Sequence, residues 1–379
     1  MALVISQEHD LLRDAAKGFL AEHAPVSALR TLRDSDDPFG YDPALWQRMT
    51  EMGWAGILVP EKYGGLDFGI VGAGLLMEEM GRTLSASPFF STAIMAATLL
   101  KEVGREAQKK RLLPQIAAGK AVVALALDEG RSHDPGGIKL AAKPSGNGFV
   151  LNGEKTFVLD GHLADQVIVA ARTGGKAGTK SGLSLFLIET DRAGLEFRRR
   201  TMVDSRNVAD ITFAEVKVDG DQLMGKLDEA YEPLEKALDV GRACLSSEML
   251  GTASEAFERT LEYLRERKQF GVPIGSFQVL QHRAAHLFSE IEMLRSVVLK
   301  TLLSLQASDA SSSFLASLAK AKAAQVVGLA TSEAIQMHGG IGMTDEFDIG
   351  FFIKRAKVAS ETYGDYYFHA DRFARIKGY

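Results

Sequence analysis

The spacing of apolar residues changes twice along the chain, which divides it into three regions. In the first region apolar residues recur every three or four positions, as in helices with one buried face. Ser6 is placed to cap the first of these helices. Its apolar face consists of Leu11, Leu12, Ala15, Phe19 and Leu20. Further helices are expected over 43–52 and 72–80, so residues 1–118 are predicted to form an N-terminal helical domain.

Short runs rich in Val, Ile and Phe mark the second region. The stretch FVLNGEKTFVLDG (149–161) has two apolar runs around Asn152-Gly153, which predicts a hairpin because both turn residues tolerate a positive φ. Three further strands are expected over 166–172, 182–189 and 210–218. Residues 119–224 are therefore predicted to form a central antiparallel β domain.

In the third region the helical spacing returns and the helices become long. One apolar stripe consists of Phe277, Leu280, Ala284, Leu287, Ile291, Leu294, Val298, Leu302 and Leu305. Its steps of three and four are typical of a helix bundle. Segments 228–268, 312–337 and 349–376 can supply the other helices, with a loop at 308–313. We expect a C-terminal four-helix bundle over 225–379, and the whole chain to be a multidomain α+β protein.

The composition is that of a globular protein, with 379 residues of which 46% are hydrophobic and 25% charged. A net charge of −5 gives no basic footprint for nucleic acid. The N-terminal residues lack the pattern of a signal peptide, and no apolar run reaches the roughly 18 residues of a spanning helix. We therefore expect a soluble, cytoplasmic protein, bacterial or of an organellar matrix, without nucleic-acid or membrane partners.

The sequence predicts no metal site and no disulfide. The chain has one cysteine, Cys244, which disfavours a structural zinc site and rules out an intrachain disulfide. His282 and His286 are four residues apart on an expected helix, but two such histidines are more often surface or packing residues. Cys244 is interpreted as a small buried apolar residue.

Two segments of the last region suggest a phosphate-bearing ligand. RKQFGVPIGSFQ (267–278) places Arg267 and Lys268 before a Gly/Pro loop and a new helix start, where backbone N–H groups and a guanidinium suit a pyrophosphate. QMHGGIG (336–342) ends a helix with bare backbone that a ligand can approach. Each segment alone is explained by an ordinary helix cap. The glycines do not form GxGxxG after a strand, which disfavours a Rossmann fold.

Together with the order of the three regions, these segments resemble the acyl-CoA dehydrogenase family. The N-terminal blocks that carry the resemblance are GWAGILVPEKYGG (53–65), EEMGR (78–82) and QKKRLLPQIAAGK (108–120). The C-terminal blocks are RERKQFGVPIGSFQ (265–278) and AIQMHGGIGMTDEF (334–347). The resemblance covers nearly the whole chain.

The resemblance implies a flavoenzyme that oxidises the Cα–Cβ bond of an acyl-CoA thioester. A carboxylate would remove the α proton, FAD would accept a hydride, and an electron-transfer flavoprotein would take the electrons. The family's subunits assemble as oligomers, in which the ADP half of FAD is held by a neighbouring subunit. The positions that match this ADP site are Arg267, Phe270, Gln278, Gln336, Gly339 and Gly340.

On the flavin-ring side the chain departs from the family. The Thr of the family's Thr-Glu-Pro-x-x-Gly-Ser-Asp segment is Leu127 here, and its Ser is His133. The family's Trp-Ile-Thr strand is Phe157-Val158-Leu159, and Leu159 has no donor for the flavin.

The positions that match the family's proton-abstracting base hold no carboxylate. The usual Glu falls on Tyr363, whose ordinary pKa of about 10 makes it a poor base near neutrality. The alternative Glu falls on Gly241, directly before Arg242, which the resemblance places at the substrate. Glu248 lies two turns beyond Gly241 and is the remaining candidate for the base.

Two acidic residues flank Tyr363 in the stretch ASETYGDYYFH (359–369). Glu361 and Asp365 each lie two positions from it, and Asp365 is equally well placed to cap the last helix.

Three functions remain open. The chain is an acyl-CoA dehydrogenase active by itself with a displaced base, or a catalytically deficient subunit that lends the ADP-binding half of the FAD site to a homologous partner. A subunit of the second kind resembles the heteromeric family members that act on steroid or other bulky acyl-CoA side chains. The third is a flavin oxidase or monooxygenase on the same fold.

Overall fold

The structure, a computed structural model, describes residues 4–379. Contacts between residues group the chain into two compact units that interleave along the sequence. The helical unit consists of residues 4–35, 70–85 and 242–379, and the sheet unit of 36–69 and 86–241. The N-terminal helices, the central β-sheet and the C-terminal helices are all present, so the predicted fold class is confirmed. The boundaries at 118/119 and 224/225 stay a prediction.

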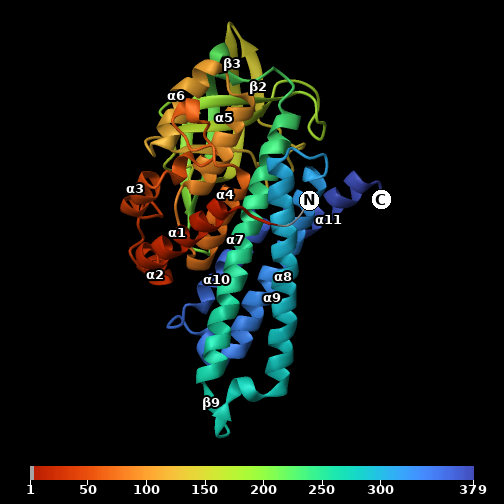
Figure 1. The fold of residues 1–379 in the computed structure, drawn as a ribbon. Coiled ribbons are helices and arrows are strands. Elements are labelled where there is room, and N and C mark those ends of the chain that lie inside the picture. Colours follow the sequence, from red (N-terminus) through yellow and green to blue (C-terminus); the bar gives the residue numbers. More distant parts are fainter. Residues whose placement is uncertain (1–3) are drawn as a thin grey trace. The chain divides into compact units, whose positions relative to one another are not determined.

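The helical unit contains three long helices, α7 (Tyr231–Glu266), α8 (Gln278–Gln306) and α9 (Ser312–His338), together with shorter ones (Figure 1). Helix α7 begins in the sheet unit and passes into the helical unit at residue 242. The shorter helices are α1 (Gln7–His23), α2 (Val26–Asp34), α4 (Ile70–Thr83), α10 (Ile349–Glu361) and α11 (Tyr366–Lys377). Ser6 caps α1 as predicted, because its side chain accepts a hydrogen bond from His9 N at 3.4 Å.

The apolar stripe of α8 forms part of the core of the helical unit. Five of its residues are almost fully buried, namely Leu287, Ile291, Leu294, Val298 and Leu302. They pack with residues of α4, α7, α9 and α10. The residues at the two ends of the stripe are half-buried. The prediction of a buried stripe is thus confirmed for the middle of the helix.

Helices α4 and α7 approach each other backbone to backbone. A Cβ on Gly81 of α4 would overlap the carbonyl oxygen of Glu248 on α7, and a Cβ on Gly251 of α7 would overlap that of Glu78 on α4. Two glycines therefore allow this approach, which side chains at either position would prevent.

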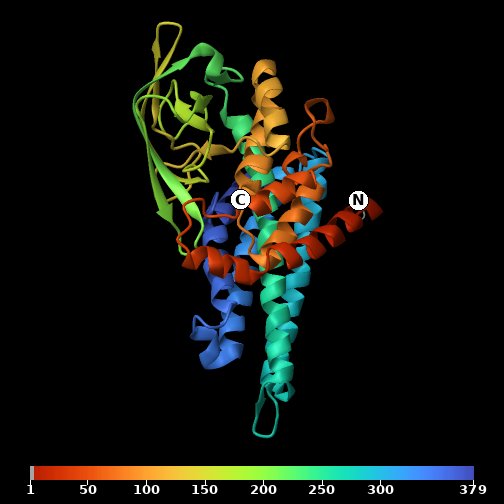
Figure 2. The same cartoon turned by 90° about the vertical axis from the view of Figure 1, so that its left-hand side faces the viewer.

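The sheet unit combines an eight-stranded sheet with helices and a π-helix. Its strands are β1 (Val123–Ala126), β2 (Ala141–Ser145), β3 (Gly148–Leu159), β4 (Gln166–Arg172), β5 (Leu183–Glu189), β6 (Leu195–Thr201), β7 (Asn207–Asp219) and β8 (Leu223–Met224). The helices are α3 (Pro43–Glu51), the π-helix η3 (Phe89–Ala96), α5 (Ala97–Val103) and α6 (Glu106–Ala117). The strand order is β6-β7-β3-β2-β4-β5-β8, with β1 paired to β4. Pairing is antiparallel except for β1–β4 and β2–β4. Figure 2 shows the long ribbon that β3 and β7 form.

The predicted hairpin at Asn152-Gly153 is wrong. Strand β3 runs straight through both residues, and its pairing with β7 shifts register there as in a β-bulge. Asn152 bonds across to Glu215, since its Oδ1 accepts from the backbone N at 2.9 Å and its Nδ2 donates to the carboxylate at 2.7 Å. The turn lies instead at Gly146-Asn147, where Gly146 has a φ of +57°. The chain thus reverses direction at Gly146-Asn147, a second pair of turn-forming residues six positions earlier.

In residues 4–379, none of the helices combines the length and the apolar character that crossing a bilayer requires.

Candidate functional site

The first segment of the candidate ADP site is a small exposed hairpin between α7 and α8. Strands β9 (Lys268–Gln269) and β10 (Val272–Pro273) form it, and Figure 1 shows it at the end of the two long helices. The Arg267 guanidinium makes no hydrogen bond or ion pair with any residue that the structure describes. Phe270 at the tip is 92% exposed and has a φ of +55°. Gln278 is exposed at the first turn of α8.

The second segment is the end of α9, which lies beside the end of α7. The ring of His338 stacks on that of Tyr263, with 4.5 Å between their centres. The next residue, Gly339, has a φ of +64°, and no atom lies within 4 Å of the position that a Cβ would take on Gly339 or Gly340. Gln336 is exposed on the last turn of α9. The structure therefore brings the two segments singled out in the sequence into one neighbourhood.

This neighbourhood suits a ligand with phosphates and an aromatic base. It offers an unpaired guanidinium, an exposed phenyl ring and open glycine backbone. In addition, Nε2 of His338 is buried and has no hydrogen-bond partner among residues 4–379. Burial lowers the pKa of His338, which keeps the ring neutral at pH 7. These features fit the ADP half of FAD.

The alternative base position, Gly241, is closed by its neighbours in the sheet unit. A Cβ on this glycine would overlap the sulfur of Met95 and would lie 3.5 Å from Cζ of Phe90. Both residues belong to the π-helix η3, whose eight residues are all buried. π-Helical turns are rare and are frequently found at functional sites. A carboxylate at position 241 requires Met95 to move.

The usual base position, Tyr363, lies between α10 and α11. Its side chain is buried, and its backbone is left-handed with a φ of +54°. Its carbonyl oxygen accepts hydrogen bonds from Nε of Arg242 at 3.3 Å and from Nε2 of His369 at 3.1 Å. Its backbone is therefore fixed by residues of α7 and α11.

The two acids that flank Tyr363 are both engaged in local bonds. Glu361 is exposed and pairs with Lys357 one turn earlier at 2.5 Å. Asp365 is the N-cap of α11, because its Oδ1 accepts a hydrogen bond from Phe368 N at 2.8 Å. This arrangement favours the structural interpretation of Asp365 over a catalytic one.

Glu248 is buried in the helical unit with a matching cation. Its Oε1 and Oε2 bind Nε and Nη2 of Arg355 on α10, each at 2.8 Å. Such a two-point ion pair stabilises a carboxylate and holds it in place. The assignment of Glu248 as the base stays a prediction, and its geometry favours a role in joining α7 to α10.

Arg242 is fully buried in the helical unit. Besides the Tyr363 carbonyl, its guanidinium lies 5.5 Å from the centre of the Phe368 ring. Its assignment to substrate binding stays a prediction. Cys244 is buried as expected, and burial raises the pKa of its thiol to about 12, which makes it inert as a nucleophile.

The segment that replaces the family's flavin-ring loop is bonded internally. Lys155 is fully buried and donates to the Leu127 carbonyl at 2.8 Å and to Glu129 at 2.7 Å. Burial lowers the pKa of Lys155 to about 8, although Glu129 opposes the shift. His133 contacts Asp128 through Nδ1 at 2.9 Å. Leu127 is buried, so its side chain adds packing and no donor.

A cavity of about 650 Å³ opens within the sheet unit. Its wall combines basic, acidic and aromatic side chains. The lining residues are Glu102, Val103, Gly104, Lys180, Ser181, Gly225, Lys226, Glu229, Tyr231, Glu232 and Pro233. Nζ of Lys180 lies 5.2 Å from the centre of the Tyr231 ring. Sequence reasoning missed this cavity, because its residues come from three separate segments.

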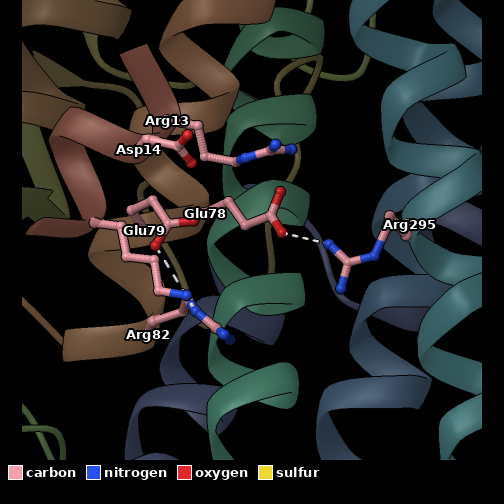
Figure 3. Close-up of a pocket in the computed structure, with 7 residues that line it drawn as sticks. Arg13, Asp14, Glu78, Glu79, Arg82 and Arg295 are labelled. Atoms are coloured by element: carbon pink, nitrogen blue, oxygen red, sulfur yellow. Dashed lines mark hydrogen bonds and ion pairs between the residues drawn. The ribbon is translucent and has the colours of Figure 1, made fainter. Parts of the chain in front are cut away.

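A smaller charged cleft of about 280 Å³ lies in the helical unit (Figure 3). Arg295 of α8 binds Glu78 at 2.6 Å, and Arg82 lies 3.7 Å from Glu79. Glu79 is buried, and this raises the pKa of its carboxyl to about 7 although Arg82 opposes the shift. Figure 3 shows Arg13 and Asp14 of α1 above Glu78, with Arg295 of α8 to the right. The cleft is explained by packing of α1, α4 and α8 through charged side chains.

Comparisons with known proteins agree with this architecture. Profiles described as the N-terminal, middle and C-terminal domains of acyl-CoA dehydrogenase match residues 6–120, 125–216 and 232–375. The chain belongs to the acyl-CoA dehydrogenase family. Members of this family are oxidoreductases that act on CH–CH bonds and are flavoproteins, generally with FAD.

Individual relatives extend over the whole chain. A probable acyl-CoA dehydrogenase of Bacillus subtilis, YngJ, is 30% identical over 366 residues, which is 94% of each chain. The acyl-CoA dehydrogenase structure from Geobacillus kaustophilus has a TM-score of 0.91 at 26% identity and covers 100% of both chains. A structure of the steroid ACAD Tcur3481-Tcur3483 has a TM-score of 0.88 at 29% identity and covers 98% of both.

Proposed function

We propose that this chain is a subunit of an acyl-CoA dehydrogenase assembly that lacks its own proton-abstracting base. It lends the ADP-binding half of the FAD site to a homologous subunit, which carries out the oxidation. The observation that supports this most is that every candidate acid is engaged elsewhere. Glu248 is held by Arg355, Glu361 pairs with Lys357, and Asp365 caps α11.

The hairpin and the end of α9 provide the half-site. Arg267 would bind a phosphate, and the bare backbone at Gly339 and Gly340 would let the ligand approach closely. Phe270 would cover the adenine face, because the ring is 92% exposed. The chemistry that FAD supplies when bound is that of a hydride acceptor for the substrate. The residues named here bind and orient it at the end remote from that chemistry.

A second candidate function is a complete acyl-CoA dehydrogenase that acts by itself with a displaced base. The cavity of the sheet unit favours this candidate, because its volume and the two lysines Lys180 and Lys226 suit the phosphates of CoA. Three glutamates in the same wall weaken the electrostatic attraction. Both functions agree with electron transfer to an electron-transfer flavoprotein and with a cytoplasmic location, which stay predictions.

Flavin content distinguishes the two candidates. The chain is purified alone and together with a homologous family subunit, and bound flavin is measured by absorbance at fixed protein concentration. We expect little flavin on the chain alone and stoichiometric flavin in the complex. Anaerobic bleaching by a panel of acyl-CoA thioesters is then measured for both samples. A fully loaded homomer that bleaches by itself would contradict the proposal and establish the second candidate.

A further inference from the structure

A sharp turn joins α10 to α11, and its conformation is unusual for the residue that occupies it. Tyr363 has a φ of +54° and the following Gly364 a φ of +109°. Bulky side chains rarely adopt the left-handed conformation, so surrounding contacts must stabilise it. The turn contains the residue that stands at the family's base position, and what fixes the turn therefore matters for the site.

Three donors from three helices bind the carbonyl oxygens of this turn. Nζ of Lys320 on α9 donates to the oxygens of Ser360 and Gly364, both at 2.9 Å. Arg242 and His369 bind the oxygen of Tyr363, as described above. The turn is thus held from α7, α9 and α11 together.

Lys320 is the unusual member of this set. It is fully buried, and its ammonium bonds to two carbonyl oxygens and to no carboxylate among the described residues. Burial first and Arg242 second lower the pKa of Lys320 to about 7. The charged groups that act on it from the packed elements are Arg242 on α7, Arg355 and Glu361 on α10, and Asp365 at the start of α11. The titratable imidazole of His369 on α11 bonds the neighbouring carbonyl of Tyr363. An isolated buried cation is unfavourable, which suggests that it serves the turn.

We propose that Lys320 is a positioning residue that fixes the backbone around Tyr363 and thereby holds the phenol ring at the base position, which keeps that position closed. The inference rests on the proposed function, in which this chain has no base of its own. Lys320 does not contact the reacting atoms and acts through Tyr363. The alternative is that Lys320 only stabilises the junction of α10 and α11.

A double-mutant cycle distinguishes these roles. The variants are Lys320→Met, Tyr363→Ala and the double variant, with Lys322→Met as the matched control because Lys322 lies on the same helix and pairs with Glu290 away from the turn. The measurement is affinity for an unreactive acyl-CoA thioether, with the chain alone and in the complex. Contacting residues couple by a factor of about 2 to 100.

If Lys320 acts through Tyr363, each single variant opens the site and raises affinity by at least about threefold. The double variant then binds no more tightly than Tyr363→Ala, and Lys322→Met binds like the wild type. Additive effects, or an unchanged affinity in either single variant, would overturn the proposal. Lys320→Gln, which retains two N–H donors, should restore most of the wild-type behaviour. If Lys320→Met does not fold, Lys320→Leu, which also lacks a donor, replaces it in the cycle.

Hydroxyl-radical footprinting tests the turn without any ligand. In the wild type, oxidation of Tyr363 should rise between pH 6 and pH 8, because neutral Lys320 forms weaker hydrogen bonds than the ammonium. In Lys320→Met it should be high at both pH values, while the buried Tyr41 and Tyr63 of the sheet unit stay protected. Equal protection of Tyr363 in the wild type and Lys320→Met refutes the positioning role.

Footprinting and the flavin measurements test the role of Lys320 and the proposed function separately. Footprinting reports on Lys320 whether or not the chain binds acyl-CoA. A wild-type homomer that is fully loaded with flavin and bleached by acyl-CoA would contradict the proposed function, whereas a Tyr363 footprint that responds to Lys320 would still hold.

Discussion

The buried pair between Glu248 and Arg355 allows a direct test of whether this glutamate is structural or catalytic. Replacing Glu248 by Gln keeps the shape of the side chain and removes its charge. The guanidinium of Arg355, 7% exposed, then remains buried opposite a neutral amide that can accept one of its two hydrogen bonds. Breaking a buried ion pair on one side typically costs about 3–5 kcal/mol. Because the amide retains part of the bonding, we expect about 3 kcal/mol for Glu248→Gln.

The assay must report on the helical unit by itself, since the two units need not unfold together. Native-state hydrogen exchange of peptides from α7 and α10 gives the free energy of opening for each helix. The double variant Glu248→Met with Arg355→Met removes both charges and should be less destabilised than Glu248→Gln alone. Glu361→Gln is a suitable control, because its pair with Lys357 lies on the surface and contributes about 0.5 kcal/mol or less.

The catalytic hypothesis makes the opposite prediction. If Glu248 is the base, Glu248→Gln should abolish anaerobic flavin bleaching by acyl-CoA, and Tyr363→Phe should leave it unchanged. A stability change below about 0.5 kcal/mol together with lost bleaching would refute the structural interpretation.

Three further predictions follow from other parts of the structure. Glu79→Gln should have little effect near pH 4 and should stabilise the protein above pH 7 by up to about 3 kcal/mol. The reason is that the pKa of Glu79 is raised to about 7 in the folded protein, so the stability of the wild type falls as pH rises from the unfolded pKa of Glu79 to about 7. Urea unfolding of both proteins from about pH 4 to 8 measures this, and a difference in stability that does not change with pH would contradict it. Gly339→Val should reduce FAD retention in the complex, whereas Gly64→Val, also at positive φ with open space, should not; equal flavin occupancy would show that the site is misplaced. Asp365→Ala should destabilise α11 by about 1 kcal/mol in hydrogen exchange, and no change would mean that the cap is dispensable.

Periodicity and caps predicted the elements of this fold well. The step of three and four from Leu287 to Leu302 identified a buried face, and Ser6 identified a helix start, because both signals act over a few residues. The hairpin at Asn152-Gly153 failed because the same dipeptide also suits a bulge, and the partner that decides, Glu215, lies 63 residues away.

The candidate site was less accessible to sequence reasoning. The two glycine-containing segments were found because exposed backbone and Arg267 have a local signature. The contact that closes Gly241 comes from Met95, and the bond that fixes the Tyr363 turn comes from Lys320. Neither residue has a distinctive local pattern, and only tertiary packing shows what they do.

The contact between Gly241 and Met95 also affects how this chain can evolve. A carboxylate that arrives at position 241 first meets a fully buried methionine, and overpacking of a core costs about 1–3 kcal/mol. If Met95 shrinks first, it leaves a hole that costs about 2–5 kcal/mol and brings no activity. In either order the intermediate with one substitution is less stable than the present chain and has no gain in activity on which selection could act. The pair therefore behaves as a ratchet, which permits the loss of an acid at this position more readily than its return.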